Sequence, residues 1–200
     1  MRHSILVRLG LCLCATITLA SQSPAQTQSR FEATLGVGTG TGTIRCSACT
    51  HAGNMGGTTY TLQLFASPQP QVRVGAMMDC WGHATDTWER DLCSLSVAAL
   101  YYPRTLRHGF FIGGGPSYGM MWASLTDTTA LLRHGWGMIT EMGFELRPRS
   151  TFSLTPYAQY SYAYVGDIYY PKDSGIPWAR GWKHSVVTVG LGLTYHAAKE

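Results

Sequence analysis

The sequence predicts an all-β fold, an eight-stranded antiparallel up-and-down transmembrane β-barrel. The first observation is an export leader, after which no apolar run is long enough for a membrane-spanning helix. The second is an apolar/polar alternation with a period of two residues, which recurs eight times. The third is a regular succession of short and long connections between these segments, as in membrane barrels.

The N-terminal residues have the order of a secretory signal peptide. A basic start is followed by an apolar run over residues 9–20 and by a small-residue cleavage site at 23–25, with Ala20 as an alternative cleavage point. This run is shorter than the roughly 20 residues that a spanning helix needs. The sequence therefore predicts a signal peptide over residues 1–25 and an outer-membrane β-barrel domain over 26–200.

Period-two alternation predicts the strands. Leu35 and Val37 share one face of the first strand, and Thr34 and Gly36 share the other. The predicted strands cover residues 31–40, 59–66, 72–79, 94–101, 110–119, 136–146, 152–162 and 185–195. Their polar faces are mainly Gly, Ser and Thr, and they largely lack the Lys and Glu of a solvated surface. A narrow polar lumen inside a lipid-facing wall therefore fits better than a water-soluble sandwich or lipocalin-like barrel.

The connections and aromatic residues predict an orientation. Short connections at 68–71, 103–108 and 147–151 alternate with long ones near 39–58, 82–92, 120–135 and 165–183. Membrane barrels have short periplasmic turns and longer external loops. Aromatic residues of the apolar face gather at both strand ends, as interface girdles do. The expected periplasmic girdle is Phe31, Tyr101, Phe110, Phe152 and Tyr195, and the expected external girdle is Tyr60, Tyr118, Trp136 and Tyr162.

Glycines and inward charges predict how the lumen is filled. The run Gly36, Gly38, Gly40 and Gly42 keeps one face small and is not the G-x-G-x-x-G of a nucleotide-binding loop. Charged residues on the inward face favour an ion-pair network over acid/base catalysis, because a charge inside a narrow barrel needs a partner. The predicted network contains Glu32, Arg73, Asp79, Glu141 and Glu145.

The cysteines left after cleavage are expected to form disulfides, because an exported chain meets an oxidising compartment. Cys80 and Cys93 share a face, and their numbers sum to 173, as a symmetric hairpin requires of opposed residues. Pairing of either one with Cys46 or Cys49 stays open. Cys46 and Cys49 otherwise predict a local loop disulfide, with metal binding through His51 as an alternative.

The last long connection mixes aromatic and cationic side chains, which suit the sugar rings and phosphates of lipopolysaccharide. The candidate binding residues are Tyr170, Lys172, Trp178, Arg180, Trp182 and Lys183. His83, His134 and His184 leave open an enzyme at the external rim, although no Ser/His/acid spacing stands out. A narrow pore or carrier is the third hypothesis. The sequence favours a non-enzymatic structural or surface-interaction role, with no cofactor and no metal.

The stretch Val189–Tyr195 resembles the last strand of small OmpA/OmpX-like outer-membrane barrels, as do Gly36–Gly40 and Phe152–Tyr157 their first and seventh strands. The resemblance implies a bacterial outer-membrane location and Leu191, Leu193 and Tyr195 as the assembly signal. It also implies outer-membrane lipid, lipopolysaccharide and the barrel assembly machinery as partners, and no nucleic acid. In the family the chain ends on its last aromatic residue, whereas residues 196–200 follow Tyr195 here.

Overall fold

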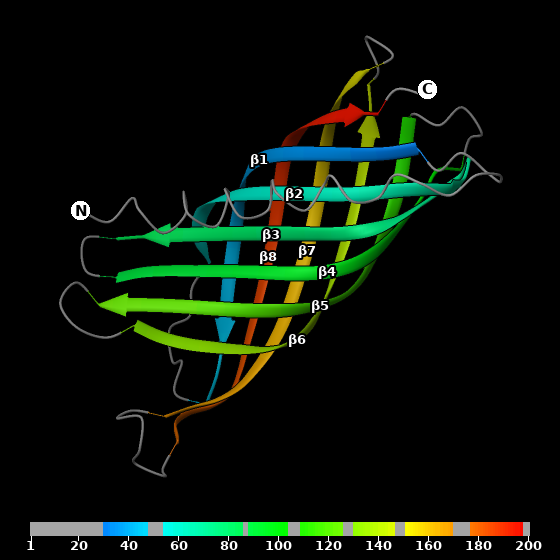
Figure 1. Cartoon of the computed structure of the whole chain (residues 1–200). Coiled ribbons are helices and arrows are strands. Elements are labelled where there is room, and N and C mark those ends of the chain that lie inside the picture. Colours follow the sequence, from blue (N-terminus) through cyan, green and yellow to red (C-terminus); the bar gives the residue numbers. More distant parts are fainter. Residues whose placement is uncertain are drawn as a thin grey trace.

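The computed structural model describes residues 30–47, 54–85, 88–103, 109–125, 130–146, 151–169 and 177–197. The strands are β1 (Arg30–Arg45), β2 (Met55–Gln69), β3 (Val72–Ala84), β4 (Trp88–Tyr101), β5 (Gly109–Leu125), β6 (Ala130–Glu145), β7 (Phe152–Tyr169) and β8 (Pro177–His196). Each strand pairs antiparallel with the next, and β8 pairs with β1 to close the barrel (Figure 1). The predicted eight-stranded antiparallel barrel is therefore confirmed. Within the described residues, no helix has the length and apolarity to cross a membrane.

The barrel has two ends that differ in their connections. We call the end where β1 begins and β8 finishes the terminal end, and the opposite end the distal end. The strands are joined at the terminal end through residues 70–71, 102–108 and 146–151, close to the predicted short turns. At the distal end the connections are 46–54, 85–87, 126–129 and 170–176.

The expected long loops were wrong in extent, because the strands continue into them. β3 has 13 residues and β8 has 20, against an expected length of about ten. Residues 85–87 alone separate β3 from β4, where a loop over 82–92 was expected. We call the part of the strands nearest the distal end, where the outward residues are no longer apolar, the distal extension. Its outward residues include Thr43, Arg45 and Lys183, so the apolar face that marked each strand in the sequence is missing there.

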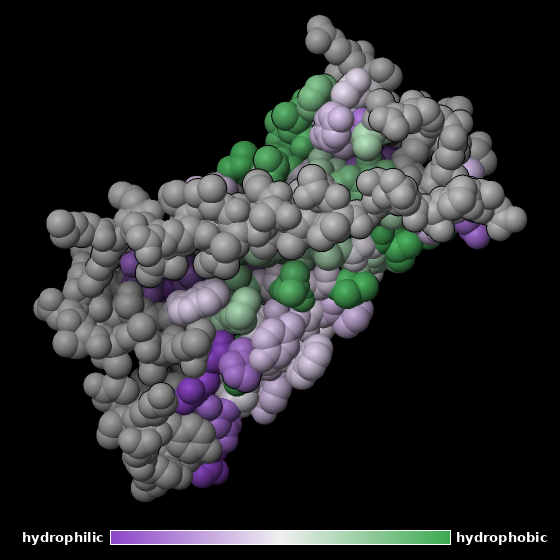
Figure 2. Space-filling view, in the orientation of Figure 1, coloured by the Kyte–Doolittle hydropathy of each residue, from purple (hydrophilic) through white to green (hydrophobic). Residues whose placement is uncertain are grey.

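The outer wall carries an apolar belt between two aromatic rings. The outward face alternates as predicted, with Leu35, Val97 and Leu193 each at least 54% exposed. Phe152 and Tyr195 contact each other at the terminal edge of this belt, and Tyr118 and Trp136 do so toward the distal edge. In Figure 2, apolar side chains show along the wall and hydrophilic ones gather toward the distal end. The belt offers lipid an apolar surface, which water would disfavour.

Inward side chains fill the lumen in layers, which can be followed along β3. Arg73 lies nearest the terminal end, and Met77 follows within an apolar cluster that also contains Phe65 and Phe111. Asp79 comes next, and Trp81 lies in a second apolar cluster within the distal extension. Eight strands leave room for side chains rather than for a wide pore.

The glycines of β1 make room for large inward side chains. A Cβ atom on Gly42 would lie 2.7 Å from Cζ2 of Trp81, and one on Gly36 would lie 3.0 Å from the hydroxyl of Tyr157. The indole of Trp81 also donates to the carbonyl of Gly40, 3.2 Å away. These glycines therefore keep the wall of β1 thin where rings from other strands cross the lumen.

A disulfide joins Cys80 and Cys93 on opposed positions of β3 and β4, with their Cα atoms 4.0 Å apart. The predicted pairing is confirmed. Cys46 is also disulfide-bonded, so neither Cys80 nor Cys93 pairs with it. Cys49 and His51 lie outside the described residues.

Candidate functional site

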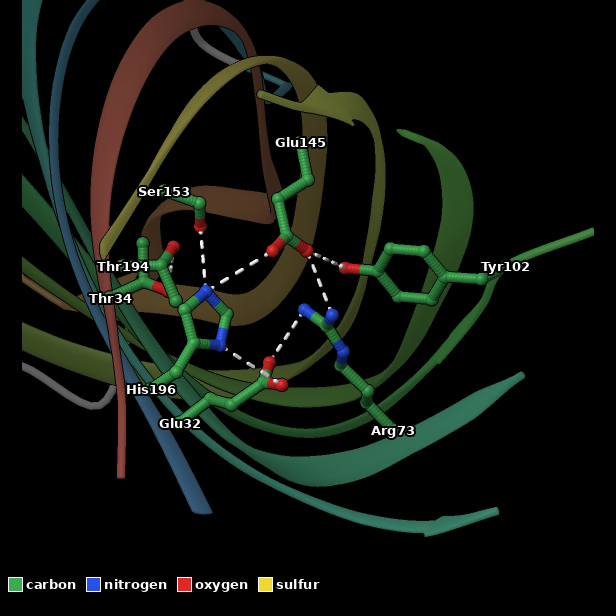
Figure 3. A network of polar contacts seen from close by, with 8 residues as sticks. All are labelled: Glu32, Thr34, Arg73, Tyr102, Glu145, Ser153, Thr194 and His196. Carbon is green, nitrogen blue, oxygen red and sulfur yellow. Dashed lines mark hydrogen bonds and ion pairs between the residues drawn. The ribbon is translucent and has the colours of Figure 1, made fainter. Parts of the chain in front are cut away.

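A buried polar network closes the terminal end of the lumen (Figure 3). Arg73 of β3 forms two ion pairs, one from Nη1 to Oε2 of Glu32 on β1 at 2.6 Å and one from Nη2 to Oε2 of Glu145 on β6 at 2.8 Å. The guanidinium also lies 4.1 Å from the ring centroid of Tyr102, whose hydroxyl donates to Glu145. The network therefore crosses the lumen and ties together strands that are not neighbours in the sheet.

His196 completes the network from β8. Its Nδ1 lies 3.2 Å from Oε1 of Glu32, and its Nε2 lies 3.1 Å from Oε1 of Glu145. Ser153 of β7 places its Oγ 2.8 Å from the same Nε2. An imidazolium donates from both ring nitrogens, which matches a carboxylate on either side. With Arg73, such a charge would balance the two carboxylates inside the lumen.

Ser153, His196 and Glu32 have the connectivity of a nucleophile, a base and an orienting acid. Their burial argues against catalysis, because Ser153 is 1% exposed and His196 is 5% exposed. The Nε2 atom that would activate Ser153 also faces Glu145. A substrate would reach this arrangement only if the terminal end of the barrel opened.

The structure divides the predicted lumen network into two groups. Glu32, Arg73 and Glu145 come together at the terminal end. Asp79 and Glu141 lie farther along the lumen, where Nε2 of Gln63 donates to Oε2 of Glu141 at 2.8 Å. The ion pairs of Arg73 and His196 described above go to Glu32 and Glu145 rather than to these two acids.

Sequence reasoning missed His196, Ser153 and Tyr102 as members of the network. His196 has the inward parity of Thr194 and pairs with Glu32 across the barrel seam, so continued alternation past Tyr195 was the available signal. Ser153 was expected on the inward face but among neutral residues. Tyr102 was expected inward as a filling ring, and its contact with Arg73 depends on three-dimensional packing.

The expected surface-binding residues do not form one loop. Trp182 is a correction, because it is 6% exposed and packs inward with Ile44 and Trp81. It lies in β8, whose alternation turns it toward the lumen. Arg180 and Lys183 are exposed. Tyr170 and Lys172 lie outside the described residues, as does the side chain of Trp178.

Three exposed cations lie near one another in the register of β1 and β8 in the distal extension. Arg45 of β1 lies directly opposite Lys183 of β8, and both are exposed. Arg180 bonds through its backbone to Ser47, with N–O distances of 3.0 and 2.9 Å. Gly181 has a φ of 62°, and this left-handed residue shifts the register so that Arg180 reaches the position opposite Ser47. We call Arg45, Arg180 and Lys183 the rim patch.

The three histidines considered for catalysis lie in strands. His184 is buried beside Trp81, at 5.4 Å between ring centroids, and His83 stacks on the same indole at 6.0 Å. His134 of β6 pairs with the hydroxyl of Tyr118 on the outer wall. These contacts give the histidines packing roles, and the described residues show no metal-binding cluster of His, Cys, Asp and Glu.

Comparison with solved structures identifies the fold. Neisserial surface protein A aligns with 82% of this chain and 96% of its own length, with 13% sequence identity and a TM-score of 0.56. The outer membrane protein OprG from Pseudomonas aeruginosa aligns with 86% of this chain and 99% of its own, with 15% identity and a TM-score of 0.51. The chain has the fold of the small outer-membrane β-barrels. No family model and no curated protein sequence matches it.

The last strand of this small barrel presents the residues expected to serve as the assembly signal. Leu191, Leu193 and Tyr195 all face outward, with exposures of 45%, 54% and 44%. Their inward neighbour Thr194 bonds to Thr34 at 2.8 Å across the seam with β1. The strand that closes the barrel therefore combines a lipid-compatible outer face with polar contacts inside.

Proposed function

We propose that this protein is a non-enzymatic barrel of a bacterial outer membrane that binds lipopolysaccharide phosphates through its rim patch. The apolar belt between two aromatic rings supports insertion into lipid. Barrel closure pairs β8 with β1 and leaves no open sheet edge in the belt, which matters because an unpaired backbone group in lipid costs several kcal/mol. The buried position of Ser153 and His196 supports a role without catalysis.

The proposed orientation places the terminal end in the periplasm. Membrane barrels of this type have short periplasmic turns and extend farther on the external side, and here the strands project beyond the apolar belt at the distal end. The distal extension, with the rim patch, then projects from the outer leaflet. Outward Leu191, Leu193 and Tyr195 would face the barrel assembly machinery and then lipid. Surface biotinylation of intact cells tests this, and labelling of a cysteine placed at Thr58 but not at Gln71 is expected.

The lumen of the proposed barrel does not conduct. The Arg73 network fills the terminal end, and Phe65, Met77 and Phe111 form an apolar layer in the terminal half. Trp81, Leu92 and Met121 belong to the cluster that fills the distal end. Planar-bilayer recordings of the purified protein should therefore show no stable large conductance. A stable open level in most insertions would favour the pore hypothesis instead.

The rim patch is the observation that carries the proposed ligand. Like charges on directly opposed strand positions destabilise a sheet unless an anion lies between them. Arg45 and Lys183 occupy such positions, and Arg180, which is also exposed, adds a third cation opposite Ser47. Lys183 also lies opposite Tyr164 of β7, an exposed aromatic residue at the distal boundary of the belt. Anionic lipid headgroups lie at this level of a membrane, and guanidinium forks suit phosphate oxygens.

Binding to lipid vesicles tests the proposal. Purified barrel would be reconstituted with phosphatidylcholine and titrated with lipopolysaccharide, followed by native mass spectrometry and Trp fluorescence. R45Q/R180Q/K183Q should weaken binding at least tenfold, and the charge-conserving R45K/R180K should keep most of it. A matched control is R90Q, which removes a partly buried cation on β4 that contacts the sulfur of Met55. Equal binding by wild type and the triple variant would reject the rim patch as the site.

A further inference from the structure

Two acidic side chains occupy the middle of the lumen without a cation. Asp79 of β3 is 2% exposed and Glu141 of β6 is 3% exposed. Gln159 of β7 lies opposite Glu141 and also faces Asp79, so it links the two acids. Gln63 satisfies one oxygen of Glu141. The two acids come from strands that are not neighbours in the sheet, so they approach each other across the lumen.

The cations at the terminal end of the lumen are bound to other acids. Arg73 and His196 contact Glu32 and Glu145 at the terminal end. Within the described part of the chain, no Lys, Arg or His lies within ion-pair distance of Asp79 or Glu141. If both are ionised, this level of the lumen holds two uncompensated charges. Burial of an unpaired carboxylate is too costly to persist, so a proton or a cation must compensate each charge.

Neutral polar atoms at the same level also lack partners. Gln159 is 3% exposed, lies opposite Glu141 in the β6–β7 register and faces Asp79. Neither atom of its amide has a hydrogen-bond partner in the described structure, and neither does Oδ1 of Asp79. The buried hydroxyls of Thr59 and Thr188 also have no hydrogen-bond partner in the described structure. An unsatisfied buried polar group costs about 1–3 kcal/mol, so these atoms together call for ordered water or an ion at this level.

We propose that the middle of the lumen binds one hard divalent cation, Ca²⁺ or Mg²⁺, through Asp79, Glu141 and Gln159. Two carboxylates match its charge, and an amide oxygen is a further hard ligand. Water molecules on the cation would then bond to the hydroxyls of Thr59 and Thr188. Protonation of the two acids would remove their charge and let one of them donate to Oε1 of Gln159, but it would give no partner to the hydroxyls of Thr59 and Thr188. A hydrated cation serves the two carboxylates, Oε1 of Gln159 and both hydroxyls, while Nε2 of Gln159 can donate to Asp79.

The site is sealed on both sides, which determines how it must be tested. Met77 and its apolar cluster lie toward the terminal end, and Trp81 and its cluster lie toward the distal end. A cation therefore enters as the barrel closes and leaves only when it opens. Addition of a chelator to the folded protein would not empty the site quickly, so the cation must be supplied or withheld during folding.

The experiment refolds the full chain from urea into detergent micelles with CaCl₂, with MgCl₂, or with EDTA. After desalting, metal content is measured by elemental mass spectrometry and thermal unfolding by circular dichroism. Wild type folded with the preferred metal should retain about one ion per chain and melt at least 5 °C above the EDTA sample. D79N/E141Q should retain none, and its melting temperature should not depend on metal. The control E89Q/D91N removes the same number of acids from β4 of the distal extension and should behave like wild type.

Several outcomes would overturn the proposal. Wild type without stoichiometric metal, and with the same melting temperature in metal and EDTA, would mean that protons and water fill the site. Metal that D79N/E141Q retains would place the ion elsewhere. If the double variant does not fold, the metal content of wild type and of the single variants D79N and E141Q decides. The result is independent of lipopolysaccharide binding by the rim patch.

Discussion

The lipid belt and the distal extension are built from the same strands with opposite polarity. In the belt part of β8, Val189 and Leu191 face outward and Thr188 faces the lumen. In the distal part of the same strand, Trp182 is buried in the lumen while Lys183 faces outward. The backbone alternation continues unchanged, but the apolar residues change sides. The belt is therefore arranged for lipid outside, and the extension is arranged like a water-soluble barrel.

The inversion recurs on other strands at the same level. On β4, Leu95 faces outward in the belt and Leu92 faces inward in the extension. On β1, Val37 faces outward and Ile44 faces inward. A period-two pattern thus reports strand geometry, while its phase reports the solvent on each side. Substitutions in the belt and in the distal extension should therefore differ in their effect on the stability of the barrel.

The largest effect is expected in the belt interior, where polar groups hold the structure. Arg73→Met would leave Glu32 and Glu145 buried without their guanidinium, which costs about 3–5 kcal/mol. Urea unfolding of the barrel in lipid vesicles measures the loss. R73M/E32Q/E145Q removes the stranded charges as well and should recover at least half of it. A triple variant as unstable as R73M would show that Arg73 acts through packing rather than charge.

In the interior of the extension, packing should replace polar contacts as the source of stability. Trp81→Ala would leave a cavity in the distal cluster and cost about 3 kcal/mol. Trp81→Phe keeps a ring and should cost less than half as much, although it loses the bond to Gly40. The same urea titration measures both. Equal losses for the two variants would assign the contribution of Trp81 to its hydrogen bond.

On the outer wall, the two regions should differ in their tolerance of charge. Val97 is 68% exposed on the belt face of β4, and Val97→Arg should destabilise the inserted barrel by about 2–4 kcal/mol. Glu89 is on the same face of β4 but in the extension. Glu89→Arg should change stability by no more than about 0.5 kcal/mol. A similar cost at both positions in lipid vesicles would remove the distinction between belt and extension.

The inversion also explains what the sequence could predict. Period two predicts the eight strands, the closed barrel, the sides of the belt residues and the Cys80–Cys93 pair. Alternate residues of a strand face opposite sides in lipid and in water alike, so this prediction does not depend on the surroundings. The strand ends at the distal side do not, because an apolar outer face was the criterion and Lys183 or Arg45 breaks it. Trp182 was assigned to a surface loop for the same reason.

The sequence predicts which charged residues of the candidate site face the lumen, but it does not predict which of them contact one another. Parity placed Arg73 and four acids in the lumen. It could not tell that Glu32 and Glu145 meet Arg73 while Asp79 and Glu141 do not, because depth along a tilted strand depends on the shear of the closed barrel. His196 was missed because the alternation was read only as far as Tyr195.

The smallest expected effect concerns two serine hydroxyls of the belt interior, one with a hydrogen-bond partner and one without. Ser153 and Ser161 both face the lumen from β7, at 1% and 2% exposure. Oγ of Ser153 bonds to His196, whereas Oγ of Ser161 has no partner in the described structure. Ser153→Ala should therefore cost about 1 kcal/mol, the net value of one hydrogen bond. Ser161→Ala removes a buried hydroxyl that gains nothing from the protein, so stability should stay equal or rise.

Urea unfolding of both variants, side by side with wild type, gives the comparison. A loss at Ser161 as large as at Ser153 would show that an ordered water or ion bonds to its hydroxyl, and it would extend the proposed cation site from Gln159 to Ser161 on β7.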